Sequence, residues 1–244
     1  MLKKLFGLRR STPGIEGTRK FADLFLEYGA DSLHKQYAAA DYLGEHSWQF
    51  SLDTGLISFG PDRTFPFQLL GSESEYDGTW MWAWANAASN INETLTRSSR
   101  RLREFGAANG IDEFCQPKFE CKEINGSLLS MVASGVCKAH AYYRCPYDGG
   151  AAFILVDFGG DLPDESPLLL RMQTVFMEFI SGFNVANHRA AFASYARLRG
   201  VRATDEGTDL LLSLGDEPVG FARFDDLNRL VHLEAEIRPS MLPG

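Results

Sequence analysis

The sequence has no long apolar run, and this argues against a membrane-spanning helix. Uninterrupted apolar stretches such as Ala151 to Val156 are far shorter than the roughly 20 residues that cross a bilayer. Residues 1–10 begin like the basic region of a secretory signal, but no apolar region follows them. We therefore expect a cytoplasmic protein without a membrane span.

Cysteine and histidine are scarce and widely spaced. No cysteine pair has the C-x2-4-C spacing that zinc sites use, and no two histidines lie two or four residues apart. The sequence therefore predicts no metal and no other cofactor. Reduced thiols are expected, with disulfides and zinc as the alternatives, for the four cysteines Cys115, Cys121, Cys137 and Cys145.

Positive charge is scarce outside the first twenty residues. Those residues contain six basic side chains and one acidic side chain, which gives them a net charge of +5. The whole chain has a net charge of −8, so the other 224 residues have a net charge of −13. An acidic body repels phosphate backbones, so nucleic acid is not expected as a partner. Residues 1–17 are interpreted as a flexible basic tail, either simply solvated or touching an anionic membrane surface or a partner.

No motif of a common enzyme class is present. The sequence contains no G-x-G-x-x-G, no P-loop, no G-x-S-x-G and no H-E-x-x-H. The triplet Asp53-Thr-Gly55 matches the way aspartic proteases present a catalytic carboxylate, but such enzymes need two. Since alternating strands flank this single triplet, a hairpin turn explains it fully.

The hydrophobic periodicity switches between helical and strand patterns in clusters, which predicts an α+β fold of antiparallel β-meanders covered by helices. Residues 18–244 are predicted to form a single domain, with a candidate sub-domain boundary near 159–163. The predicted helices cover residues 18–37 with a break at Gly29, 92–108, 122–138, 164–180 and 187–199. The predicted strands cover residues 48–52, 56–59, 64–70, 79–85, 139–144, 151–158, 209–214, 219–224 and 229–237.

Tryptophans at alternate positions stand out in the stretch GTWMWAWAN, residues 78–86. In a strand, Trp80, Trp82 and Trp84 would share one face, either as an aromatic core or as a stacking platform for a ligand. Asn86 would lie at the rim of a pocket or cap the following turn. The other candidate ligand- or partner-binding side chains are Tyr142, Tyr143 and Asp157.

The stretches FSLDTGLISFG, FPFQLLGSES, GTWMWAWAN and NHRAAFASYARLRG together resemble an uncharacterised bacterial domain family. Its signature is a T-W-x-W-A-W-A-N strand, and the resemblance spans roughly residues 20–237. The resemblance implies a bacterial, cytosolic protein with one continuous domain. It implies no activity, because the family is described only as a domain of unknown function.

Two functional hypotheses follow from the residues. The first is a binding or interaction protein without enzymatic activity, such as an immunity or accessory protein whose acidic surface meets a basic partner. The second is a small-molecule enzyme or ligand sensor with a pocket beside the tryptophan strand. Oligomeric state does not follow from the sequence.

Overall fold

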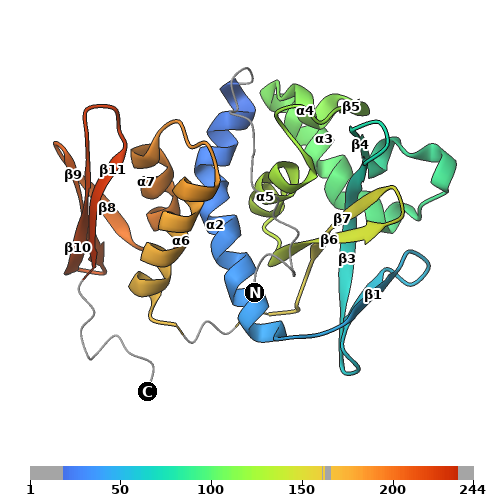
Figure 1. Cartoon of the computed structure of the whole chain (residues 1–244), viewed down its shortest axis with the longest axis horizontal. Helices are drawn as coiled ribbons and strands as arrows, with labels where there is room; N and C mark the ends of the chain where they lie inside the picture. Colours follow the sequence, from blue (N-terminus) through green and yellow to red (C-terminus); the bar gives the residue numbers. More distant parts are fainter. Residues whose placement is uncertain (1–18, 161, 163–165, 236–244) are drawn as a thin grey trace.

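The computed structural model describes residues 19–160, 162 and 166–235, over which the chain forms six α-helices and eleven β-strands. Antiparallel sheets of seven and four strands lie at opposite sides of a central group of helices (Figure 1). The predicted α+β class is therefore confirmed. The basic tail predicted for residues 1–17 lies outside the described residues.

Helix α2 (Arg19–Leu43) runs without a break through Gly29, so the predicted interruption there is wrong. A Cβ atom added at Gly29 would lie 2.6 Å from the ring of Phe179 in helix α6 (Leu168–Gly182). The missing side chain thus lets α6 pack closely against α2. This packing offsets the roughly 1 kcal/mol that glycine costs inside a helix.

The seven-stranded sheet is built around the long strand β3 (Arg63–Ser74), which pairs with β2 in its first part and with β4 and β7 further along. This strand continues four residues beyond its predicted end, because Gly71 to Ser74 pair with neighbours on both sides. The other strands of the sheet are β1 (Trp48–Ser51), β2 (Leu56–Phe59), β4 (Thr79–Trp82), β5 (Lys118–Glu120), β6 (Ala141–Tyr147) and β7 (Gly150–Val156).

The tryptophan strand is shorter than predicted. Strand β4 ends at Trp82, and residues Ala83–Ala85 form a single 3₁₀ turn. Trp84 therefore leaves the alternating pattern, and the prediction that all three indoles share one strand face is wrong. Alanine on both sides of Trp84 allows this turn, since alanine favours helical backbone more than strand.

The segment between β4 and β6 holds three α-helices and the short strand β5. Asn92 accepts a hydrogen bond from the Thr94 N–H and starts the turn that leads into α3 (Arg97–Asn109), which Gly110 ends in a left-handed conformation. The predicted helix over residues 122–138 begins later than expected. Its observed form is α5 (Gly126–Val136), and α4 (Asp112–Cys115) and β5 before it were not predicted.

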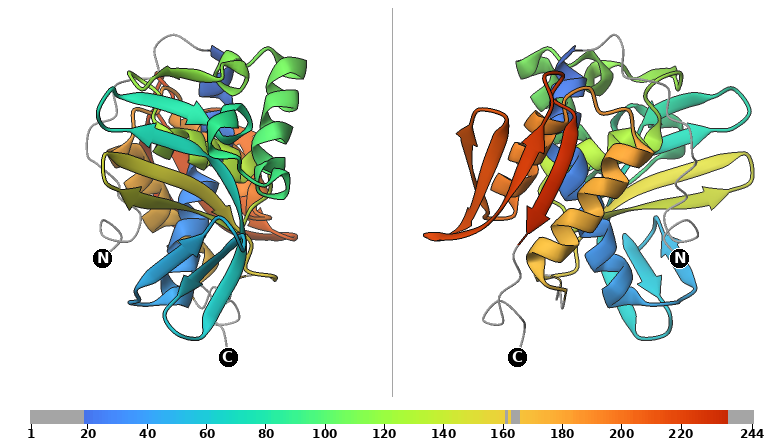
Figure 2. Two further views of the ribbon diagram at one scale, coloured as in Figure 1. Left: turned by 90° about the vertical axis from the view of Figure 1, so that its right-hand side faces the viewer. Right: turned by 60° about the vertical axis from the view of Figure 1, so that its left-hand side comes forward.

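The C-terminal part packs a helical pair on a four-stranded sheet of order β11-β10-β9-β8 (Figure 2). The Asn187 side chain accepts a hydrogen bond from the Ala190 N–H and caps α7 (His188–Leu198), and Pro167 takes the capping position of α6. A bulge lies in β11 between the pairs Arg223–His232 and Phe224–Leu230, and Val231 in this bulge is exposed. The strands are β8 (Arg202–Glu206), β9 (Asp209–Leu214), β10 (Glu217–Phe224) and β11 (Leu230–Ala235).

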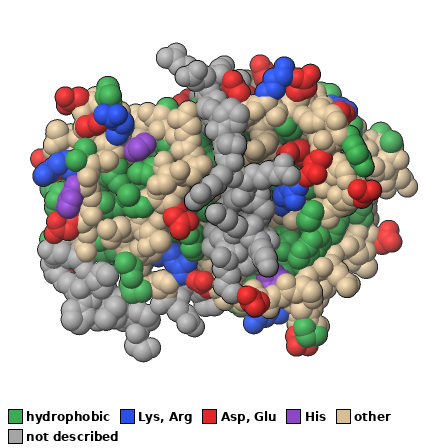
Figure 3. All heavy atoms as spheres, viewed as in Figure 1, with side chains coloured by type: hydrophobic (Ala, Val, Ile, Leu, Met, Phe, Trp, Pro, Cys, Tyr) green, Lys and Arg blue, Asp and Glu red, His purple; other side chains and the backbone are tan. Residues whose placement is uncertain are grey.

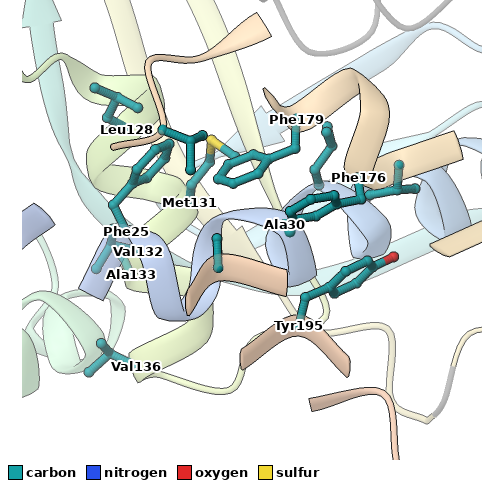
Figure 4. Close-up of a cluster of buried hydrophobic side chains, with 14 of the residues drawn as sticks. Phe25, Ala30, Leu128, Met131, Val132, Ala133, Val136, Phe176, Phe179 and Tyr195 are labelled. Atoms are coloured by element: carbon teal, nitrogen blue, oxygen red, sulfur yellow. The ribbon is translucent and has the colours of Figure 1, made fainter. Parts of the chain in front are cut away.

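Helix α2 lies at the centre of the core, between α5 on one side and α6 and α7 on the other (Figure 1). Figure 4 shows apolar side chains from these four helices meeting in one buried cluster. Phe25 contacts Phe179 of α6 with ring centroids 5.2 Å apart. Burying rings of this size is a main source of folding free energy.

Buried polar side chains on α2 also join it to its neighbours. The Asp31 carboxylate accepts hydrogen bonds from Arg199, and His34 Nδ1 lies 2.6 Å from the Tyr195 hydroxyl. Gln36 bonds to the backbone of Tyr142 in both directions, at 2.9 and 3.2 Å. The side-chain amide of Gln36 thus bonds to the edge of β6, where the N–H and carbonyl of Tyr142 would otherwise have no partner.

Within residues 19–160, 162 and 166–235, no helix is both long and apolar enough to cross a bilayer.

Candidate functional site

Trp80 and Trp82 lie in the hydrophobic core. Both are 0% exposed, and their rings meet edge to face with centroids 5.2 Å apart. The Trp82 indole N–H donates a hydrogen bond of 2.8 Å to the Glu113 carbonyl. Neither ring offers a surface on which a ligand could stack. Of the two interpretations of the tryptophan face, the aromatic core therefore applies to this pair.

Trp84 is half-buried, and the Arg103 guanidinium lies over its ring at 4.5 Å from the centroid. Its indole nitrogen is buried and has no hydrogen-bond partner among the described residues. The Asn86 side chain accepts a hydrogen bond from the Ser89 N–H, so it caps the turn that follows the strand. The contacts that these two side chains make are therefore local ones.

Tyr142 and Tyr143 are buried in strand β6, 1% and 3% exposed. Burial raises the pKa of both hydroxyls well above the ordinary value, so both are protonated at neutral pH. Tyr143 packs edge to face against Trp48 and Phe59. Their positions are those of core residues.

Among the candidates from the sequence, Asp157 lines a pocket formed by the described residues. The pocket has a volume of about 430 Å³ and opens between β3, the start of α3 and the turn from α5 into β6. Helix α3 runs beside β3 (Figure 2). We call this the β3–α3 pocket. It is lined by Pro66, Phe67, Gln68, Arg97, Ser98, Arg101, Cys137, Lys138, Ala139, His140, Leu155, Val156 and Asp157.

Gln68 fixes the relative position of the two walls. Its side-chain nitrogen donates to the Thr94 carbonyl at 3.0 Å, and its oxygen accepts from the Ser98 N–H at 3.2 Å. The amide of Gln68 thus caps the start of α3 from the neighbouring strand. This contact holds Arg97 and Arg101, one helical turn apart, on the side of α3 that faces the pocket.

Fixed positive charge is concentrated in this pocket although the chain as a whole is acidic. Arg97, Arg101 and Lys138 are exposed, and none has an ion-pair partner in the described part of the chain. Arginines at i and i+4 repel each other by a few tenths of a kcal/mol in a helix. Elsewhere, acidic and basic side chains are interspersed over the face shown in Figure 3.

Lys138 has a backbone conformation that lysine rarely adopts. Its φ is 56°, and the Lys138 and Ala139 N–H groups bond back to the Gly135 and Ser134 carbonyls. These two bonds form a Schellman motif, in which the left-handed residue is usually glycine. The other non-glycine residues with positive φ in the described ranges are asparagines, which tolerate it. A lysine here is therefore unfavourable for folding and brings an ammonium group to the pocket.

His140 and Asp157 line the pocket side by side. His140 Nδ1 lies 3.0 Å from Asp157 Oδ1 and also 3.1 Å from the Phe158 backbone nitrogen. The two contacts need opposite protonation states of Nδ1. The Phe158 N–H requires a lone pair on Nδ1, whereas the ion pair with Asp157 requires a proton there. Asp157 Oδ1 also accepts from the Gly159 N–H at 2.9 Å.

Cys137 lines the same pocket but is a poor nucleophile. Burial raises the pKa of its thiol to about 11, so the thiolate is scarce at neutral pH. All four cysteines are unpaired, in agreement with the expected reduced thiols. The described residues hold no group of three or more His, Cys, Asp or Glu side chains arranged to bind a metal ion.

Sequence reasoning missed the basic side chains of this pocket. It did not select Arg97, Arg101 or Lys138 as candidates. The four-residue spacing of the two arginines in the predicted helix was a usable signal. The convergence of α3 with the α5–β6 turn depends on the sheet, which local patterns do not reveal.

The chain is thus an α+β protein with an aromatic core and a basic surface pocket. It belongs to a family of unknown function (DUF6882), whose sequence profile matches residues 22–158. The match runs from α2 to the residues after β7 and includes every residue that lines the pocket. No match to the chain was found among curated proteins or among solved structures.

Proposed function

We propose that this protein binds a small anionic ligand in the β3–α3 pocket and acts as a binding protein or ligand sensor rather than an enzyme. The observation that carries the proposal is the set of unpaired cations, Arg97, Arg101 and Lys138, around one hollow on an acidic chain. We further propose, from the resemblance, that it works in the bacterial cytoplasm.

The unfavourable lysine supports binding as the role of the pocket. Residues kept in uncommon backbone conformations cluster at functional sites, where their side chains serve a ligand. The weak nucleophile of the pocket supports binding over chemistry, because burial raises the pKa of the Cys137 thiol and keeps it protonated at neutral pH. The pocket volume of about 430 Å³ is in the range of small-molecule sites.

A thermal-shift screen tests the proposal. Small anions should raise the melting temperature of the wild-type protein in a concentration-dependent way, whereas neutral and cationic compounds of similar size should not. The double variant Arg97→Gln/Arg101→Gln should lose this response. Arg100→Gln is the matched control, because Arg100 is on the same helix but pairs with Glu93 and does not line the pocket. An anion response that survives in the double variant would refute the proposal.

A second candidate function, docking of a basic partner protein, is favoured by one observation at the far end of the sheet. Tyr76 and Tyr147 are 82% and 51% exposed at the tips of two neighbouring hairpins. A Cβ added at Gly149 would lie 2.0 Å from the Tyr76 ring, so the two turns are in contact. Exposed carboxylates at the same tips are Asp148, Glu75, which pairs with Arg144, and Asp77, which pairs with Lys118.

Exposed tyrosine is typical of protein interfaces, and acidic neighbours favour a basic partner. A pull-down with wild-type protein and with the Tyr76→Ala/Tyr147→Ala double variant tests this candidate. A basic partner should be retained by the wild type at low salt and lost with the double variant. Equal recovery by both proteins would rule out the tyrosine tips as the docking surface.

A further inference from the structure

We infer that the anion bound in the β3–α3 pocket is the dianion of a phosphate monoester with a small organic body. This inference rests on the proposed function and specifies its ligand. It follows from three properties of the pocket: the hydrogen-bonding character of its side chains, their net charge, and the size of the space they enclose.

Apart from the Asp157 carboxylate, the side chains of the pocket offer mainly hydrogen-bond donors. The Arg101 guanidinium, the Lys138 ammonium and the Ser98 hydroxyl have no partner among the described residues. The Arg97 Nε–H bonds to the Thr94 carbonyl, which leaves its terminal nitrogens available. The amide of Gln68, which could have offered an acceptor, is used within the protein. An acceptor-only ligand group matches this set.

Phosphate meets this requirement better than a carboxylate. Donors approach the pocket from α3 on one side and from the α5–β6 turn on the other. The three terminal oxygens of a phosphate monoester point in different directions and can receive both groups, whereas a carboxylate has two oxygens in one plane. Arginine in particular binds phosphate through paired, charge-assisted hydrogen bonds.

The charge of the pocket also matches a dianion. Arg97, Arg101 and Lys138 supply three positive charges and Asp157 one negative charge, so the balance of these four side chains is +2. A phosphate monoester has its second pKa near 6 and is mostly a dianion at neutral pH. A sulfate ester or a simple carboxylate carries one charge and would leave the pocket incompletely neutralised.

The pocket is too large for phosphate alone. Its volume of about 430 Å³ is the size of sites that hold whole organic ligands. Part of its wall is apolar and can pack against the organic body of an ester. The apolar lining residues with accessible surface are Pro66 and Ala139, whereas Phe67, Leu155 and Val156 are buried.

Isothermal titration calorimetry at pH 7.5 with three probes tests the inference. Phenyl phosphate should bind about tenfold tighter than phenyl sulfate, which has the same shape and one charge fewer, because it makes stronger charge-assisted hydrogen bonds. Inorganic phosphate should bind more weakly than phenyl phosphate, since it lacks the apolar body. The variant Arg101→Gln should weaken phenyl phosphate binding about tenfold or more, and Arg100→Gln should leave it unchanged.

Each contrary outcome overturns a specific part of the reasoning. Equal affinity for phenyl phosphate and phenyl sulfate would overturn the dianion inference and leave anion binding intact. Equal affinity for inorganic phosphate and phenyl phosphate would overturn the inference that the ligand has an organic body. If Arg100→Gln and Arg101→Gln reduce the affinity for phenyl phosphate by similar factors, the anion is held by general electrostatic attraction and not by a defined site. If no anion in the thermal-shift screen binds either, both the inference and the proposed function fail.

Discussion

Replacing Lys138 by glycine should make the protein more stable and its pocket weaker. Lys138 occupies the left-handed position of a Schellman motif at φ 56°. An L-residue with a side chain costs about 1 kcal/mol there, and glycine does not have this cost. The side chain of Lys138 is exposed, so its removal leaves no cavity in the core. We expect Lys138→Gly to raise the free energy of unfolding by about 1 kcal/mol.

For a chain of 244 residues, a gain of that size corresponds to an increase in melting temperature of about 2–4 °C. Urea unfolding followed by far-UV circular dichroism measures the free energy, and calorimetry with phenyl phosphate measures the affinity. The affinity should fall about tenfold, because the ammonium group is lost.

Two further substitutions separate backbone strain from charge. Lys138→Ala removes the charge and keeps the strain, so it should weaken binding without the gain in stability. Lys138→Asn should lie between alanine and glycine in stability, since asparagine tolerates the left-handed region. The reasoning is refuted if Lys138→Gly is no more stable than Lys138→Ala, or if all three variants bind phenyl phosphate as well as the wild type.

Three other predictions concern the framework. Trp82→Ala should destabilise the protein by about 3–5 kcal/mol in urea unfolding, because a fully buried ring is removed; a loss below about 1 kcal/mol would contradict its place in the core. Gly29→Ala should destabilise by about 1–3 kcal/mol despite better helix propensity, since the new Cβ meets Phe179 at 2.6 Å; a gain in melting temperature would contradict this. Burial lowers the pKa of His188 below 6.5, and its Nδ1 accepts a hydrogen bond from the Leu230 N–H. The unfolded chain therefore binds a proton at this histidine at a higher pH than the folded chain does. The free energy of unfolding should decrease as pH falls below 6.5. His188→Gln should flatten that decrease in unfolding curves measured from pH 7 to pH 5, and an unchanged slope would exclude His188 as its source.

The sequence allowed the fold class and many elements to be predicted where local chemistry is decisive. Asn187 caps α7 and Gly110 ends α3, because capping depends on side chains a few residues away. The strands predicted over residues 139–144 and 151–158 correspond to β6 and β7, which pair as a hairpin. Gly29 was misread because its role is to admit a ring from α6, 150 residues further along the chain.

The candidate site was harder to predict than the fold. Alternating tryptophans drew attention to residues 80–84, yet two of the three rings are core and the third leaves the strand after Trp82. Asp157 was named for its place at the end of a buried strand, and it does line a pocket. The cations opposite it come from α3 and the α5–β6 turn, and only the three-dimensional arrangement brings them together.

The central position of α2 constrains how this chain can change. The family match begins within α2 and ends at residue 158, whereas α6 and α7, which cover one face of α2, follow that segment. Phe25, Asp31 and His34 contact these later helices. A fragment cut after residue 158 would present the Phe25 ring to water and leave Asp31 and His34 without their partners, so the shorter piece would be prone to associate with itself. Relatives without the C-terminal helices would need a hydrophilic residue at the position of Phe25, whereas Asp31 and His34 are already polar.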